Sequence, residues 1–155
     1  MKKKIGIASD HGGRELKFRV VNLLQELQFD VVDHGVPRED PTSVDYPDLA
    51  KKLCEGITDG DYSRGILICG TGIGISIAAN KFPNIRAALV WDEFTVKMSR
   101  FHNDANVLCL GERALNHDRA MDLVKLWLDT PFEGGRHQSR LDKIKAIENN
   151  LYKQG

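Results

Sequence analysis

The sequence predicts an α/β protein in which a five-stranded parallel sheet lies between helices. Five short runs rich in Ile, Val and Leu recur along the chain, and segments with helical spacing of apolar residues separate them. Such alternation is typical of a parallel sheet that is covered on both faces. Because 155 residues suffice to bury one core, we expect residues 1–155 to form a single domain.

The predicted strands are short and are mostly bounded by Gly, Asp or Asn, residues that end strands. They lie at residues 4–9, 29–34, 65–69, 85–90 and 106–110. Helical spacing predicts helices around residues 16–27, 49–57, 94–101 and 117–130, a short helix that begins near Gly74 or Ile75, and a C-terminal helical segment at about 138–151.

Composition excludes several classes of function. The 22 basic and 22 acidic residues give a net charge of zero, so no overall field favours nucleic acid or an anionic membrane. Lys4 and Asp10 lie too close for a signal peptide, and no apolar run is long enough to span a bilayer. The three cysteines are widely spaced, which argues against a disulfide framework or a structural zinc site. We expect a cytoplasmic protein.

One stretch, ICGTGIGIS at residues 68–76, sets a cysteine before three alternating glycines. A dinucleotide-binding pattern and a cysteine phosphatase loop would need Gly and Arg, respectively, where Ile75 stands, and a P-loop would need a lysine that is absent. What remains is a strand that ends at Cys69, a glycine loop and a helix. Backbone N–H groups in such a loop can hold an oxyanion.

Cys69 is the candidate base of this loop. A thiolate at a helix N-terminus is stabilised by the helix dipole and by backbone amides. No acidic residue lies between Asp61 and Asp92, so no carboxylate of the loop can take that role. The alternative is that Cys69 is a small buried apolar residue and that the glycines only let helix and sheet pack closely.

Other polar clusters lie near strand ends. Asp10 and His11 follow the first strand, while His102 and Asn103 lie just before the fifth. We expect all four to project over the same sheet edge as Cys69, where ligands of open α/β sheets bind. In the simpler interpretation Asp10 caps a helix, His11 faces solvent and His102 is a cation at a helix C-terminus.

Arg136 and Arg140 are four residues apart, so a helix would put both on one face. Guanidinium groups suit phosphate oxygens, although a solvated basic surface has the same pattern. Four further residues are interpreted as structural: His34, Cys54, Cys109 and His117.

Five ordered segments resemble the ribose and galactose phosphate isomerase family: SDHGG (9–13), DYPD (45–48), CGTGIGIS (69–76), RFHNDANVLCLGER (100–113) and GGRHQSR (134–140). The resemblance covers nearly the whole chain. It implies a Rossmann-like three-layer α/β/α sandwich that interconverts ribose 5-phosphate and ribulose 5-phosphate without metal or cofactor. It also implies sites formed between the two subunits of a homodimer, which can itself pair into a dimer of dimers.

The resemblance also implies catalytic roles. Cys69 would be the base that moves a proton between C1 and C2 of the sugar. His102, helped by Asp10 and Thr71, would open the furanose ring, and Asn103 would orient the sugar oxygens.

By the same resemblance, the loop after the third strand supplies an amide cradle for the enediolate, formed by Gly70, Thr71, Gly72, Ile73 and Gly74. Tyr46 matches a position in the pocket wall. The positions that match phosphate-binding residues, some supplied by the partner subunit, are His11, Arg113, Arg136 and Arg140.

Two other functions remain open at this stage. One is an isomerase of a six-carbon sugar phosphate, such as allose 6-phosphate or galactose 6-phosphate, because a few pocket side chains can change chain-length preference. The other is a non-catalytic sugar phosphate sensor with the same anion site. The presence of both Cys69 and His102 favours an enzyme.

Overall fold

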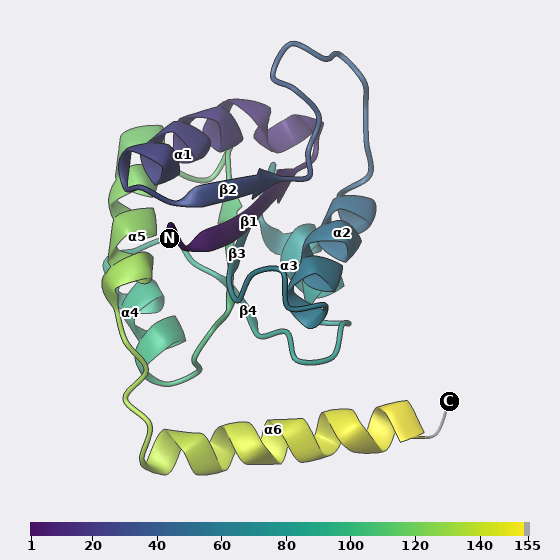
Figure 1. The fold of residues 1–155 in the computed structure, drawn as a ribbon, viewed down its shortest axis with the longest axis vertical. Helices are drawn as coiled ribbons and strands as arrows, with labels where there is room; N and C mark the ends of the chain where they lie inside the picture. The colour runs from purple at the N-terminus through teal and green to yellow at the C-terminus, as the bar shows by residue number, and fades with distance from the viewer. Residues whose placement is uncertain (154–155) are drawn as a thin grey trace.

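The computed structural model describes residues 1–153 and contains a five-stranded sheet with helices on both faces (Figure 1). Four strands have both ends within one residue of the predicted range and β4 begins two residues later than predicted, which confirms the predicted α/β class. The strands are Lys4–Ser9 (β1), Asp30–Asp33 (β2), Gly65–Cys69 (β3), Ala87–Leu89 (β4) and Val107–Gly111 (β5).

The helices begin where the sequence supplies capping groups or turns. The Asp92 side chain accepts a hydrogen bond from Thr95 N, and Asn116 accepts from the first turn of the helix that follows it. The helices are His11–Gly13 (η1, a 3₁₀ turn), Arg14–Glu26 (α1), Tyr46–Thr58 (α2), Ile73–Ala79 (α3), Glu93–Phe101 (α4), His117–Asp129 (α5) and Arg136–Lys153 (α6).

All strand pairs are parallel, and the strand order is β2-β1-β3-β5-β4. The last strand, β5, therefore lies between β3 and β4, and the two outer strands are β2 and β4. Residue Cys69 at the end of β3 is in register with Gly111 at the end of β5. The carboxyl ends of the strands thus meet along one edge of the sheet.

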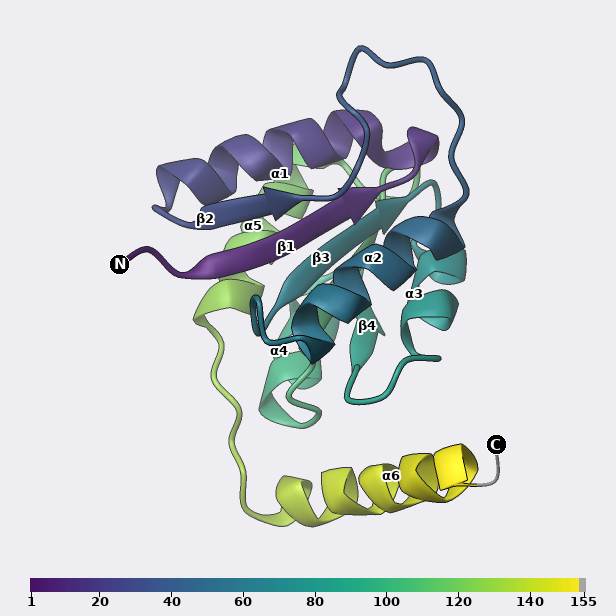
Figure 2. The ribbon, with the colours of Figure 1, turned by 45° about the vertical axis from the view of Figure 1, so that its right-hand side comes forward.

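Two apolar cores lie on opposite faces of the sheet. In β3, Ile66 and Ile68 face the core shared with α1, α4 and α5, whereas Leu67 and Cys69 face the core shared with α2 and α3. This alternation follows the two-residue period of a strand. The three layers are visible in Figure 2, and they match the expected α/β/α sandwich.

Helix α6 stands apart from the three layers and is reached through the extended segment 130–135 (Figures 1 and 2). Glu148 accepts a hydrogen bond from Asn84 N (2.9 Å), and Leu141 is buried. A groove of about 630 Å³ separates α6 from the β4 side of the body. Four apolar side chains of α6 remain exposed: Ile144, Ile147, Leu151 and Tyr152.

Helix α6 begins two residues earlier and ends two residues later than predicted. Gly134 and Gly135 have positive φ angles of 68° and 56° and turn the chain into the helix. Arg136 and Arg140 lie within it, as their spacing predicted. Within residues 1–153, no helix has the length and apolarity needed to cross a membrane.

The buried Tyr62 fills space that two glycines leave open. A Cβ atom on Gly6 of β1 would lie 2.4 Å from the Tyr62 ring, and one on Gly56 of α2 would lie 2.1 Å from its hydroxyl. That hydroxyl donates to the carbonyl of Leu53 (3.0 Å) and lies 2.6 Å from His34 Nε2. These contacts hold Tyr62 in place, so moving its ring aside would break them. His34 has the structural role that the sequence suggested.

We predict that Gly56→Ala destabilises the protein, although alanine in a helix is normally more stable than glycine. The added methyl group overlaps Tyr62, and overpacking of this kind costs about 1–3 kcal/mol. The measurement is the free energy of unfolding from urea titration. Glu55→Ala, at the neighbouring exposed position, is the control and should change it by less than about 0.5 kcal/mol. A Gly56→Ala variant as stable as the control would contradict the packing described.

Candidate active site

Cys69 ends β3, and its side chain is only 4% exposed. The N–H of Gly72 donates a hydrogen bond to its sulfur at 3.1 Å. Gly72 adopts a left-handed φ of 77°, and a Cβ atom there would lie 2.9 Å from the backbone of Leu110. Only glycine fits this position. A donor at this place stabilises a thiolate more than a neutral thiol.

The loop after Cys69 is fastened to the end of β5. The carbonyl of Cys69 accepts from Glu112 N, and that of Gly70 accepts from Arg113 N, both at 2.9 Å. The Arg113 guanidinium lies over Gly70, with one nitrogen 3.4 Å from where a Cβ would stand. The Glu112 carboxylate accepts from Leu16 N at 2.7 Å, which ties α1 to the same point.

Glu112 did not emerge from the sequence as a functional candidate. Its only signal there was its position directly after a strand, where site residues of parallel sheets gather. In the structure its backbone N–H binds the carbonyl of Cys69 and its carboxylate binds Leu16 N of α1.

The amide cradle is smaller than the glycine pattern suggested. Two of its N–H groups are already used, that of Gly72 by Cys69 and that of Ile73 by the Thr71 hydroxyl (3.1 Å). Gly74 is in the first turn of α3, where helix geometry leaves N–H groups without an intrahelical partner. The Tyr46 ring covers it, 2.7 Å from where a Cβ would stand. Tyr46 therefore packs against the glycine loop, and its place in a pocket wall stays a prediction.

Asp10 and His11 lie beside this loop. The Asp10 carboxylate accepts from Gly12 N (2.9 Å) and caps the η1 turn, as the simpler interpretation held, and it is 8% exposed. A Cβ on Gly12 would lie 3.2 Å from Gly70 N, so the two loops are in contact. His11 is exposed, and its Nδ1 lies 3.2 Å from Ser43 Oγ.

The expectation that His102 and Asn103 share this edge is wrong for a single chain. Both residues precede β5, and Asn106, just after them, accepts through its carbonyl from Gly65 N at the start of β3. Cys69 is at the other end of β3. Because all strands run in parallel, a segment that enters a strand lies at the edge opposite to one that leaves it.

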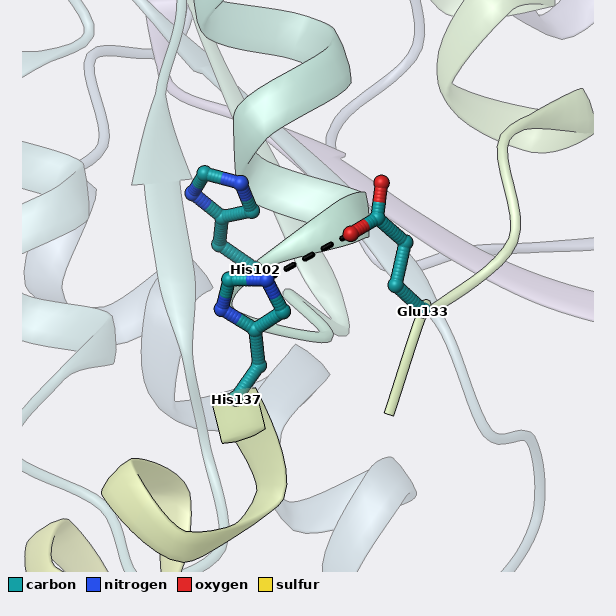
Figure 3. A group of neighbouring side chains, drawn as sticks. All are labelled: His102, Glu133 and His137. Carbon is teal, nitrogen blue, oxygen red and sulfur yellow. Dashed lines mark ion pairs between the residues drawn. The ribbon is translucent and has the colours of Figure 1, made fainter. Parts of the chain in front are cut away.

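A second polar cluster therefore lies near the amino-end edge. His102 ends α4, and its ring stacks on that of His137 in α6 with centroids 4.1 Å apart and planes at 16° (Figure 3). Glu133 Oε2 lies 3.4 Å from His137 Nε2. Arg136 and Arg140 belong to the same end of α6. His137 stands inside the segment GGRHQSR, but no spacing in the sequence marks it as a site residue.

The nitrogen and oxygen atoms of this cluster lie within 4.8 Å of one another, close enough to consider a metal site. Metal ligands direct their lone pairs at one point. The near-parallel rings of His102 and His137 instead direct their in-plane lone pairs side by side. The arrangement suits stacking better than chelation.

The other two cysteines differ from Cys69. Cys54 and Cys109 are fully buried in the core between the sheet and α2. Burial raises the pKa of Cys54 to about 12 and raises that of Cys109 as well. Neither thiol can ionise near neutral pH, which is consistent with the structural roles that the sequence suggested.

Comparison with known proteins agrees with this geometry. A family model described as Ribose/Galactose Isomerase matches residues 5–144. The chain is 48% identical to a putative sugar phosphate isomerase of Bacillus subtilis and 44% identical to ribose-5-phosphate isomerase B of Escherichia coli, in each case over 94% of this chain and 97% of the relative.

Solved structures agree as well. Ribose-5-phosphate isomerase B of Clostridium thermocellum superposes with a TM-score of 0.91 at 50% identity, over 96% of this chain and 99% of the other. The type B enzyme of Leishmania infantum gives 0.90 at 41% identity, over 97% and 99%. With the thiol, the glycine loop and the sheet in place, the chain belongs to the ribose/galactose isomerase family.

Proposed function

We propose that this protein is an aldose–ketose isomerase that interconverts D-ribose 5-phosphate and D-ribulose 5-phosphate, with Cys69 as the base. The observation that carries the proposal is the hydrogen bond from Gly72 N–H to the Cys69 sulfur beside the glycine loop, in a chain of this family. Relatives named ribose-5-phosphate isomerase B support the choice of a five-carbon substrate.

The reaction needs a base and a site for negative charge. The Cys69 thiolate removes the proton from C2 of the open-chain aldose, the electrons of that bond form a C1–C2 double bond, and the carbonyl oxygen on C1 becomes negative. Return of the proton to C1 and transfer of the O2 proton to O1 give the ketose. The glycine loop supports the intermediate through N–H groups such as that of Gly74.

Local charges suit the phosphate, although the protein as a whole is neutral. The Arg113 guanidinium lies over Gly70, next to the thiol loop, and His11 is exposed on the neighbouring loop. We propose that both contact the phosphate. Arg136 and Arg140 are suited to the same task but belong to the opposite end of the molecule.

That separation supports a shared site between two copies of the chain. β3 alone separates the two edges by roughly 13 Å at about 3.3 Å per residue. His102 of one copy and Cys69 of another can meet only if the two edges of different copies face each other. We propose a homodimer with two such sites, each with Cys69 from one chain and His102, Asn103, Arg136 and Arg140 from the other.

Exposed apolar surface near the thiol supports the same assembly. Ile73 and Ile77 lie one turn apart on α3 and are 54% and 58% exposed, and Trp91 and Phe94 near the start of α4 are 56% and 69% exposed. Exposed apolar side chains that gather in one region mark interaction surfaces. The exposed apolar side chains of α6 add further apolar surface that a second copy could cover.

We predict that Cys69→Ala lowers turnover of ribose 5-phosphate by about 10²–10⁴-fold because the proton acceptor is lost. Binding of the sugar phosphate should persist, since phosphate contacts remain. Proton NMR in D₂O containing a chelator follows loss of the C2 proton signal and formation of ribulose 5-phosphate, and calorimetry follows binding. Cys54→Ala removes a buried thiol as control. Near-normal turnover by Cys69→Ala would rule out this base.

We predict that two inactive variants complement each other. A mixed dimer of Cys69→Ala and His102→Gln chains contains one intact site and one doubly altered site. Unfolding and refolding an equimolar mixture should restore about a quarter of wild-type activity, because half the dimers are mixed. Each variant refolded alone is the control and should stay inactive. No gain on mixing would show that Cys69 and His102 do not meet across two chains.

A further inference from the structure

The stacked rings of His102 and His137 form a second polar arrangement, away from the thiol loop. His102 is half-buried at the C-terminus of α4, and His137, in the first turn of α6, is 4% exposed. The two rings are stacked, and Figure 3 shows them close together with the Glu133 carboxylate beside the His137 ring. Three separate segments of the chain thus converge on one imidazole.

Backbone contacts build this arrangement. Glu133 N donates to the carbonyl of Phe101, the residue before His102, at 3.2 Å. The buried Arg100 side chain donates to the carbonyls of Thr130 (3.1 Å) and Ala105 (2.7 Å). The segment between α5 and α6 is therefore fixed to the end of α4. Gly134 and Gly135 then turn the chain so that His137 meets His102.

The charge state of His137 suits a supporting role. Burial, and after it the nearby charge of His102, lower the pKa of His137, and Arg136 and Arg140 act in the same direction. Glu133 alone opposes them. His137 is therefore neutral near neutral pH. A neutral ring can lie against a protonated His102 without competing for its proton, whereas two charged imidazoles would repel each other.

Other charged side chains lie near His102. On the His102 side, Arg100 and Asp104 pair with each other at 2.8 Å, and Arg86 donates to the carbonyl of Asn103 at 2.9 Å. These groups are engaged with one another or with backbone. The contact considered for the His102 imidazole is therefore its stacking on the ring of His137.

We propose that His137 is a positioning residue for opening of the sugar ring: stacking on its ring holds the His102 imidazole in the plane in which it delivers a proton, and Glu133 holds His137. The inference rests on the proposed function. In that step the O1 proton passes to Asp10 of the adjoining copy, the O1–H electrons form the C1–O1 double bond, the C1–O4 bond breaks, and O4 takes a proton from His102.

The two directions of the reaction separate this step from the chemistry at Cys69. Ribose 5-phosphate is mostly cyclic and must be opened. Ribulose 5-phosphate cannot close through O5, which carries the phosphate, so its C1 proton can exchange with solvent without any ring opening. A residue that serves only ring opening should affect the first process and spare the second.

The test is His137→Gln, which removes the ring. We expect turnover of ribose 5-phosphate to fall by about tenfold or more, because a misplaced proton donor loses that much. Exchange of the ribulose 5-phosphate C1 proton in D₂O, followed by NMR, should stay at the wild-type rate. His137→Phe keeps a flat buried ring and should recover most of the turnover. Circular dichroism melting checks that both variants are folded.

His117→Gln is the matched control, since it removes a half-buried histidine from the start of α5 and should leave both rates unchanged. Equal loss in both assays for His137→Gln, or a Phe variant no better than the Gln variant, would overturn the inference. If the wild-type protein neither converts ribose 5-phosphate nor exchanges ribulose 5-phosphate, the proposed function itself fails and the inference falls with it.

Discussion

The pairing of β3 with β5 is the constraint on which the site depends. It continues beyond the two strands, where the N–H groups of Glu112 and Arg113 bind the carbonyls of Cys69 and Gly70. These two hydrogen bonds fix the thiol, the glycine loop and a guanidinium relative to one another. Glu112 extends the same constraint to α1 through Leu16. A loop of small residues, which by itself would be mobile, is in this way held to the most buried part of the sheet.

Much of the fold could be predicted because local pattern determines it. Strand runs such as GILIC are apolar throughout, and their ends are set by Gly, Asp and Asn. The position of β5 between β3 and β4 could not be predicted in the same way, because it depends on where a crossover connection packs. The full length of α6 was underestimated because its residues are mostly polar and only Leu141 and His137 are buried.

The site shows the same division. Cys69 and its loop were identified from residue type and spacing, and their hydrogen bonds fit that interpretation. The edge predicted for His102 is wrong because His102 precedes β5 and so lies at the amino ends of the parallel strands, whereas Cys69 lies at the carboxyl end of β3. His137 has no distinctive spacing, and its partner Glu133 lies across a glycine turn. Only the three-dimensional path of residues 130–137 brings them to His102.

The two strands at the borders of the sheet have a further consequence. β4 has three residues, and β2 has four and is bounded by the charged Asp30 and Asp33. Short, charged borders offer few free backbone groups to an incoming strand, which protects a protein against aggregation through strand addition. The proposed association of copies of this chain therefore relies on side chains of the helices and not on strand pairing. Such contacts can be adjusted by substitution without disturbing the sheet that carries the thiol.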